Sequence, residues 1–499
     1  MNEIQNNIEN NLNTDITTKS FQSAIWMFFS LFCVRVTRFI SFIILARILE
    51  PKDFGILAIA TMTIGVLEVI TSLGFEVALI QKKGDVYSYL DTAWVTNIVR
   101  GLIISLILFI FAPLIALFFK IPAARDVVRI VGFTAFMNGF TNIGTLFFFK
   151  ELDLKKKFYM EFSGVLSYAV ISIFLSFLLR NVWALVGGYI SLVIVNIIFS
   201  YILSPYRPHL YWNYYKAKEM LEFGKWILGL NIGRYISSLI DEGFVGKIID
   251  ATSLGFYNKA KMIANLPLSL TYNVVSKVAF PMYSKIQDST EDISRKFCKI
   301  LDTIFSFSLP FAAVVLLLGD ELIEFILGRK WLPMCVPLKA LLLVMIIQTV
   351  LETCYPLFKG LGRPDIEFKV NVLQLVITTA LLYPLTKSFN MLGTAIASLS
   401  GSIFVLPICL NQLLKTTNLN LKFNDIIRSF ICPTVGIVII SGITIISQQI
   451  LGRNVLAIIA ICIILIFMYL IYLYLCWRYL KIGPYPTIIK LLKMIRGNV

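Results

Sequence analysis

Apolar segments of about twenty residues recur from Phe21 to Trp477, separated by short polar or basic connections. A helix needs about 20 apolar residues to cross the hydrocarbon core of a bilayer, so this pattern predicts a series of membrane-spanning helices. We therefore expect an all-α integral membrane protein with fourteen transmembrane helices. The expected spans cover residues 21–46, 55–73, 92–119, 129–149, 158–179, 182–203, 223–246, 254–276, 300–318, 336–358, 367–386, 390–414, 429–448 and 455–477.

The composition excludes most soluble proteins. Of the 499 residues, 58% are hydrophobic and 15% are charged, whereas soluble domains are about 45–50% apolar and about 25% charged. No polar stretch is long enough for a separate folded domain, which excludes a pump with its own nucleotide-binding domain. His209 is the only histidine, and none of the eight cysteines forms a CxxC pair. We therefore expect no catalytic residue, no metal site and no cofactor.

The distribution of basic residues predicts the orientation in the membrane. When the connections are assigned alternately to two sides, 26 lysines and arginines fall on one side and 11 on the other. Cytoplasmic loops carry the excess of positive charge, so both termini are expected in the cytoplasm. The polar segment 1–20 reads as a disordered cytoplasmic tail, and 478–499 as a basic cytoplasmic tail. The net charge of +16 therefore indicates membrane topology and not a nucleic-acid partner.

A weak internal repeat appears at an offset of 200 residues. It aligns Trp26 with Trp226 and Gly55 with Gly255, and it includes polar turns between helices. Chance similarity between apolar helices is the alternative. A true repeat of six helices would give two lobes of the same orientation, with substrate commonly bound between them. The expected division is an N-lobe at 21–203, an interfacial connector at 204–222, a C-lobe at 223–415 and two accessory helices at 416–477.

Several charges lie inside the expected spans, although each costs roughly 2.5–3.5 kcal/mol at the bilayer centre. Arg35 and Arg38 share one face of the first helix, and Arg234 lies at a similar level in the seventh. Their guanidinium groups suit phosphate oxygens, so a hydrated cationic cavity for an anionic substrate is one interpretation. Internal ion pairs are the other. The acidic residues considered for ion pairing or ion coupling are Glu68, Asp241 and Glu242.

Four segments resemble those of bacterial polysaccharide exporters, the oligosaccharide-lipid flippases of the multidrug/oligosaccharidyl-lipid/polysaccharide (MOP) superfamily. They are LARILEPKDFGILAIA at 45–60, FFFKELDLKKKF at 147–158, LGFYNKAKMIANLPLSLTYNVVSKVAFPMYSKIQ at 254–287 and KGLGRPD at 359–365. The similarity covers about 20–420 and is nearest to exporters of the colanic-acid, teichuronic-acid and O-antigen type. It implies fourteen helices in two lobes around a cationic cavity whose arginines fall on Arg35, Arg38 and Arg234.

The resemblance also implies the location, the bacterial cytoplasmic (inner) membrane, and the activity. Such a protein moves an undecaprenyl-pyrophosphate-linked oligosaccharide from the cytoplasmic to the outer leaflet of that membrane by alternating access. The expected partners are that anionic lipid, membrane lipids and a coupling ion, H+ or Na+; a monomer is favoured. The family's coupling site does not map clearly onto this chain, and Asp241 and Glu242 are only candidates.

Three other functions remain open at this point. A drug or cation antiporter of the same superfamily should have an acidic and aromatic cavity. A peptidoglycan-precursor flippase is a close relative with a different lipid. A glycan polymerase or lipid-linked glycosyltransferase would need a large outer loop, and the longest outer connection expected here is 319–335.

Overall fold

In the computed structural model, every regular element of the described residues is a helix. Eight of these helices are long and apolar enough to cross a membrane, or nine if one bent pair forms a single span. The described residues are 26–27, 29–71, 79, 84–151, 153–268, 279–280, 282–284, 286–287, 289–417, 434–436, 442, 465, 467–469, 471–472, 474 and 478, without the side chains of 221–231, 234 and 290. The all-helical membrane fold is thus confirmed, while the count of fourteen spans and their arrangement in lobes stay predictions.

Most of the predicted spans are found close to their expected positions. The spans predicted at 429–448 and 455–477 lie almost entirely outside the described residues, as do the tail at 1–20 and all but one residue of the tail at 478–499. The helices are Phe29–Ile48, α2 (Pro51–Ile70), α4 (Tyr87–Phe119), α5 (Ala124–Gly139), η1 (Ile143–Leu146), α6 (Phe147–Lys150), α7 (Leu154–Leu179), α8 (Val182–Leu203), α9 (Tyr214–Ile248), α10 (Ala251–Ala264), α12 (Thr290–Ile326), η2 (Arg329–Met334), α13 (Cys335–Gly360) and α14 (Pro364–Thr417).

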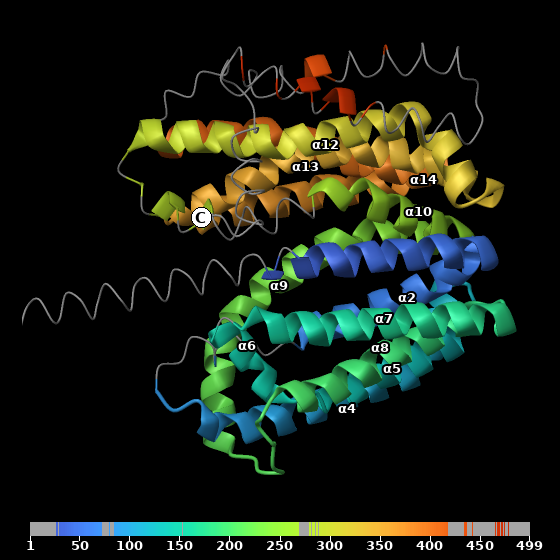
Figure 1. Cartoon of the computed structure of the whole chain (residues 1–499), viewed down its shortest axis with the longest axis vertical. Helices are drawn as coiled ribbons and strands as arrows, with labels where there is room; N and C mark the ends of the chain where they lie inside the picture. Colours follow the sequence, from blue (N-terminus) through green and yellow to red (C-terminus); the bar gives the residue numbers. More distant parts are fainter. Residues whose placement is uncertain are drawn as a thin grey trace, which may run out of the picture. The chain divides into compact units, whose positions relative to one another are not determined.

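The chain folds as two compact units. Unit 1 comprises residues 1–239 with 250–255, and unit 2 comprises 240–249 with 256–499. In unit 1, the antiparallel pairs α4–α5 and α7–α8 lie beside α2 (Figure 1). The first pair turns at Lys120 and the second at Arg180, which adopt left-handed φ angles of 58° and 50°. Such single left-handed residues commonly end a helix and reverse the chain.

Two equivalent glycines of the proposed repeat contact each other within unit 1. A Cβ atom on Gly55 of α2 would lie 1.8 Å from the carbonyl oxygen of Ala251, and one on Gly255 would lie 2.0 Å from that of Pro51. Each glycine thus faces the backbone four residues before its counterpart. Only a residue without a side chain permits this approach, so the first turns of α2 and α10 meet through their backbones.

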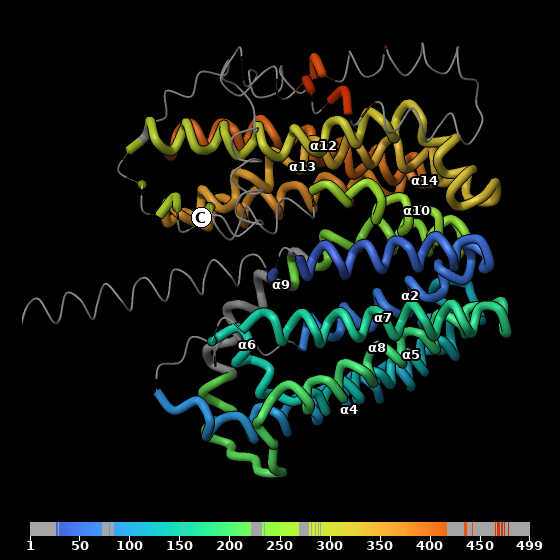
Figure 2. Tube along the Cα trace, in the orientation of Figure 1, coloured from blue at the N-terminus to red at the C-terminus, as the bar shows by residue number. Residues whose placement is uncertain are grey.

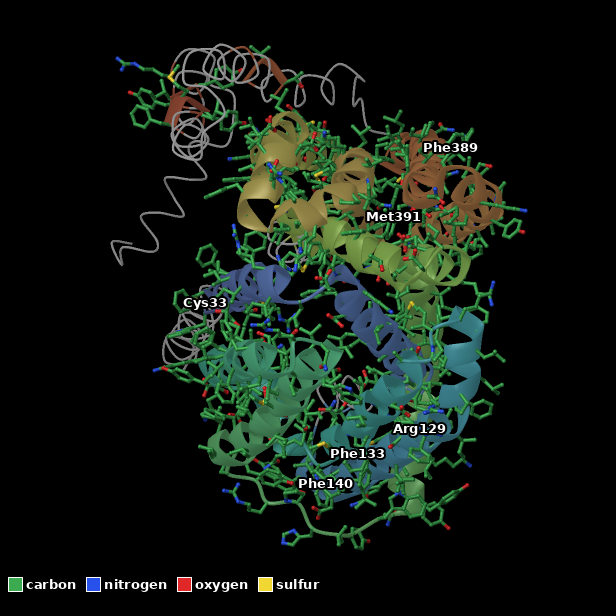
Figure 3. The ribbon with its side chains drawn as sticks, turned by 90° about the vertical axis from the view of Figure 1, so that its right-hand side faces the viewer. Cys33, Arg129, Phe133, Phe140, Phe389 and Met391 are labelled. Carbon is green, nitrogen blue, oxygen red and sulfur yellow. The ribbon has the colours of Figure 1, made fainter. Side chains whose placement is uncertain are left out.

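Unit 2 is built around α12, α13 and α14, which run side by side (Figure 2). Its core is a large cluster of buried aliphatic and aromatic side chains that includes Phe297, Phe305 and Phe358. Helix α14 is interrupted at Asn390, whose φ of 53° and ψ of −137° are non-helical. The labels of Phe389 and Met391 mark this break (Figure 3). The interruption agrees with the predicted boundary between the spans 367–386 and 390–414.

The span predicted at 129–149 is wrong as a single straight helix. Helix α5 ends at Gly139, and the following segment bends by 77°. The bend arises at Asn142, whose side-chain oxygen accepts a hydrogen bond from the N–H of Gly144 at 2.9 Å and whose amide donates to Tyr206 O at 2.7 Å. An asparagine side chain that bonds to nearby backbone competes with the helix, which explains the break.

Two other predicted boundaries also move. Helix α9 begins at Tyr214, nine residues before the predicted start of that span. Asn213 caps it, because its side-chain oxygen accepts hydrogen bonds from the N–H groups of Tyr215 and Lys216 at 3.0 and 3.2 Å. The span predicted at 254–276 corresponds to α10, which ends at Ala264, where Asn265 forms a turn.

Candidate functional site

Arg35 and Arg38 lie on the inward face of the helix Phe29–Ile48. At about 100° per residue, they share a face with Phe42 and Leu45, whose side chains are 5% and 1% exposed. The exposed apolar side chains of this helix follow a different stripe, about 150° away. That stripe comprises Phe29, Phe32, Val36, Ile40 and Ile44. The two arginines therefore do not belong to the apolar outer surface of the helix, on which membrane lipid would lie.

Neither arginine is neutralised by a carboxylate in the described part of the chain. No described aspartate or glutamate lies within 4.0 Å of either guanidinium group. The Nη1 atom of Arg35 is buried and has no described hydrogen-bond partner. Arg38 remains exposed although it occupies the inward face. A buried, uncompensated guanidinium is costly, so this arrangement favours a site that an anion or water completes.

Two tyrosines of unit 1 lie within electrostatic range of Arg38. The phenols of Tyr168 in α7 and Tyr189 in α8 interact electrostatically with the Arg38 guanidinium group. Tyr189 also interacts electrostatically with Glu68 of α2, and Glu68 interacts with Arg100 of α4. Tyr189 therefore lies within electrostatic range of charged groups on both the first helix and α2. The role that the sequence offered for Glu68, as a partner of the arginines, stays a prediction.

The third predicted arginine cannot be placed at the site. The side chain of Arg234 lies outside the described residues. Its neighbour Tyr235 is described, and a Cβ atom on Gly65 of α2 would lie 1.7 Å from the Tyr235 hydroxyl. This segment of α9 therefore packs closely on α2 inside unit 1. The convergence of Arg234 with Arg35 and Arg38 stays a prediction.

Asp241 and Glu242 form a buried ion-pair cluster in unit 2. Lys261 of α10 donates hydrogen bonds to both carboxylate oxygens of Asp241, at 2.8 and 3.0 Å, and lies 3.4 Å from Glu242 Oε1. The Tyr257 hydroxyl donates to Asp241 Oδ2 at 3.0 Å, and the Asn258 amide donates to Glu242 Oε2 at 2.7 Å. The Asp241 and Glu242 side chains are 8% and 9% exposed, and that of Lys261 is 20% exposed.

This cluster combines two carboxylates with one ammonium group, so its formal charge is −1. Lys261 already occupies the position between the carboxylates that a cation would take. Among the described residues, no group of three or more histidine, cysteine, aspartate or glutamate side chains could hold a metal ion. The geometry therefore favours an internal ion pair, which one more proton would neutralise.

The segment before α9 is fixed to the start of α4. Asp91 accepts hydrogen bonds from the Tyr206 hydroxyl and from the His209 N–H, the latter at 2.8 Å. Burial, and then the hydrogen bond to Asp91, raise the pKa of Tyr206 above its ordinary value, which keeps the phenol neutral. Beyond this anchor, Leu210 is 86% exposed and Tyr215 is 80% exposed. Exposed aromatic residues at a helix end are typical of a membrane–water interface.

Sequence reasoning found the arginines but missed their surroundings. Tyr168 and Tyr189 belong to no motif, and Lys261 lies in the 254–287 segment without an assigned partner; each reaches its partners from a different helix. The only available signal was that Lys261 is a charge inside an apolar segment, which implies a buried partner. Its spacing from Asp241 crosses the turn between α9 and α10, so helical periodicity does not pair them.

Known proteins resemble this chain over most of its length. Residues 44–336 match the family described as "Polysaccharide biosynthesis protein". The lipopolysaccharide biosynthesis protein WzxC of Escherichia coli K12 is 24% identical, over 66% of this chain and 68% of its own length. The teichuronic acid biosynthesis protein TuaB of Bacillus subtilis 168 is 23% identical, over 87% of this chain and 91% of its own.

Solved structures show the same fold. The lipid II flippase MurJ in an inward closed conformation superposes with a TM-score of 0.74 at 16% identity, covering 92% of this chain and all of that one. A multidrug-resistance transporter of the MATE family, in an inward-facing conformation, gives a TM-score of 0.60 at 14% identity, covering 78% and 96%. Both likenesses agree with the MOP superfamily that the sequence motifs indicated.

Proposed function

Because the chain belongs to the polysaccharide biosynthesis protein family of the MOP superfamily, we propose that it flips an undecaprenyl-pyrophosphate-linked oligosaccharide from the cytoplasmic to the outer leaflet. The relatives named for lipopolysaccharide and teichuronic acid biosynthesis support a surface-glycan precursor as the substrate. Further support comes from the described residues, which form eight or nine apolar helices long enough to span a bilayer. The protein would act as a transporter and not as an enzyme.

The observation that carries the proposal is a pair of arginines that no carboxylate of the described residues neutralises. Arg35 and Arg38 present two guanidinium groups on an inward face of unit 1. A guanidinium stays charged at any depth, and its fork of donors matches phosphate oxygens. Two such groups three residues apart suit the two phosphates of a diphosphate headgroup. Arg234, the residue before Tyr235 in α9, is the proposed third contact.

The proposed mechanism follows from the substrate's two solubilities. Its polyprenyl tail is stable in hydrocarbon, whereas its diphosphate and sugars are not, so only the headgroup needs a polar path. Arginines that replace part of its hydration would lower that barrier. Alternating access between two helical repeats would then expose the headgroup first to the cytoplasmic and then to the outer side.

Flipping by purified protein in vesicles tests the proposal. Replacing Arg35 and Arg38 by glutamine should reduce the initial rate at least tenfold, because a hydrogen bond to a charged group contributes about 1.5–3 kcal/mol. Arg125→Gln is the matched control, since Arg125 is exposed and paired with Asp126 at 3.0 Å. If the double variant flips the lipid at the wild-type rate, the arginines do not form the substrate site.

The main competing function is export of cationic drugs, which the MATE-like fold permits. A cationic substrate should be repelled by Arg35 and Arg38, so their replacement would leave dye efflux unchanged or raise it. The peptidoglycan-precursor flippase remains the other alternative, supported by the likeness to MurJ. Depletion that lyses cells, instead of removing only a surface polymer, would favour that substrate.

For ion coupling, the cluster of Asp241 and Glu242 supports H+ better than Na+. Lys261 already binds both carboxylates, so a sodium ion would have to displace it. The rate of flipping in sodium-free choline buffer should therefore equal the rate in sodium buffer. A requirement for sodium would contradict this assignment without affecting the substrate.

A further inference from the structure

Three consecutive lysines open helix α7. Lys155, Lys156 and Lys157 follow Leu154 in its first turn, and the carboxylate of the capping residue Asp153 accepts a hydrogen bond from the Lys156 N–H. The N-terminus of a helix carries a partial positive charge, so lysines there are unfavourable unless an anion compensates them. The first turn of α7 is thus more cationic than helix stability requires.

Carboxylates compensate two of the three lysines. Lys156 lies 3.1 Å from Asp153, and Lys157 lies 3.3 Å from Glu161. Among the described residues, Lys155 has no carboxylate within 4.0 Å of its ammonium group. In the described part of the chain, a carboxylate partner is therefore present at Lys156 and Lys157 but not at Lys155.

Lys155 lies over an aromatic surface that two helices build. Its ammonium nitrogen is 5.7 Å from the ring centre of Trp26 and 6.0 Å from that of Tyr159. The ring centre of Phe158 in α7 lies 5.8 Å from that of Trp26 and 5.4 Å from that of Phe29. Cation and aromatic groups together suit a ligand that is anionic at one end and apolar at the other.

The first helix also carries the arginines of the candidate site, farther along its axis and on another face. The first helix and α7 run side by side (Figure 1), with Trp26 against Tyr159 near one end and Arg38 within electrostatic range of Tyr168 farther along. Figure 3 labels Cys33 on this stretch of the first helix, two residues before Arg35. At 1.5 Å per residue, Arg35 lies about 9 Å and Arg38 about 13 Å beyond Phe29 along the helix axis.

We propose that Lys155, with Trp26 and Tyr159, is the site that receives the diphosphate of the lipid-linked substrate at the inner leaflet. The phosphates would lie against Lys155, and the first apolar units of the lipid chain against Trp26 and Phe29. From there the headgroup would pass along and around the first helix to Arg35, which lies on another face. This inference rests on the proposed flippase function, and it assigns the uptake step to residues other than Arg35 and Arg38.

The test compares Lys155→Gln with wild type in flipping assays with vesicles of phosphatidylcholine alone. The KM for the lipid-linked oligosaccharide should rise about tenfold, while kcat stays within twofold, because Lys155 acts before the arginines. Lys155→Arg should restore the KM. Lys299→Gln, which removes an exposed charge from the start of α12, is the matched control and should leave KM unchanged. An unchanged KM for Lys155→Gln would overturn the inference.

Two further measurements separate the possible failures. If Lys155 binds bulk anionic phospholipid instead, the effect of Lys155→Gln should appear only in vesicles containing phosphatidylglycerol, which would also overturn the inference. If wild type flips no lipid-linked oligosaccharide, the proposed function fails. Binding of undecaprenyl diphosphate to both proteins in phosphatidylcholine nanodiscs then decides the inference separately, since equal affinities would contradict a diphosphate site at Lys155.

Discussion

Lys261 binds two buried carboxylates at once, so its removal should be more damaging than the loss of an ordinary surface charge. Lys261→Met leaves Asp241 and Glu242 without a counter-charge, and breaking a buried pair from one side costs about 3–5 kcal/mol. We expect the free energy of unfolding in mixed micelles to fall by that amount. Lys387→Met, at an exposed lysine of unit 2, should change it by less than about 0.5 kcal/mol.

The same cluster predicts rescue by neutralisation. Adding Asp241→Asn and Glu242→Gln to Lys261→Met removes the uncompensated charges and keeps side chains of similar volume. Stability should then recover most of the loss, because buried ion pairs often contribute little net stability over neutral replacements. Failure of this triple variant to recover would mean that the pair is needed for packing or for a proton that the cluster holds.

For single residues, the sequence predicted which charged side chains lie inside apolar spans better than it predicted the groups that they contact. Arg35 and Arg38 were singled out because a guanidinium group inside an apolar span is costly unless it has a partner or a function. Which groups lie near them was not predictable, since that depends on how the helices of unit 1 pack. The pairing of Lys261 with Asp241 required the turn between α9 and α10, whose geometry no local pattern specified.

The element scale is governed by close contacts between helix backbones. Gly55→Ala should lower the midpoint of thermal unfolding, because its Cβ would lie 1.8 Å from the carbonyl oxygen of Ala251 and the two helices must move apart. Overpacking of this kind costs about 1–3 kcal/mol. Gly255→Ala should behave alike, since its Cβ meets the carbonyl oxygen of Pro51 at 2.0 Å.

Gly243→Ala is the control for this prediction. Gly243 also lies within a helix, but a Cβ there would meet no atom within 4 Å. Alanine is the better helix former by up to about 1 kcal/mol, so this variant should be neutral or slightly more stable. Equal destabilisation by Gly55→Ala and Gly243→Ala would show that the backbone contact between α2 and α10 is not responsible.

Hydropathy predicted the helices well wherever an apolar run coincides with one helix. Helix α8 begins and ends at the predicted residues 182 and 203. The errors occur where a polar side chain bonds to the backbone. Asn142 interrupts an apolar run, and Asn213 starts α9 ahead of the apolar run. Both asparagines are visible in the sequence as residues that end or begin helices, but a hydropathy average over many residues hides them.

At the scale of the whole molecule, the excess of basic connections on one side predicts that both termini are cytoplasmic. A reporter fused after Val499 that is active only in the cytoplasm should therefore be active, and one inserted after Lys120, between α4 and α5, should not. The opposite pattern would invert the membrane orientation. It would place Lys155 at the outer leaflet and remove it from the uptake route.

Orientation and substrate charge together predict a dependence on membrane potential. The substrate's diphosphate is negative, and an inside-negative potential favours its outward movement by about 2.3 kcal/mol per charge per 100 mV. Outward flipping in vesicles should therefore accelerate when a potassium diffusion potential makes the donor side negative, and slow when the polarity is reversed. Arg35→Gln/Arg38→Gln should retain the sign of this dependence at a lower rate, because the substrate carries the charge that crosses. A rate indifferent to the imposed potential would mean that no net charge crosses the membrane in the rate-limiting step, which would contradict this prediction.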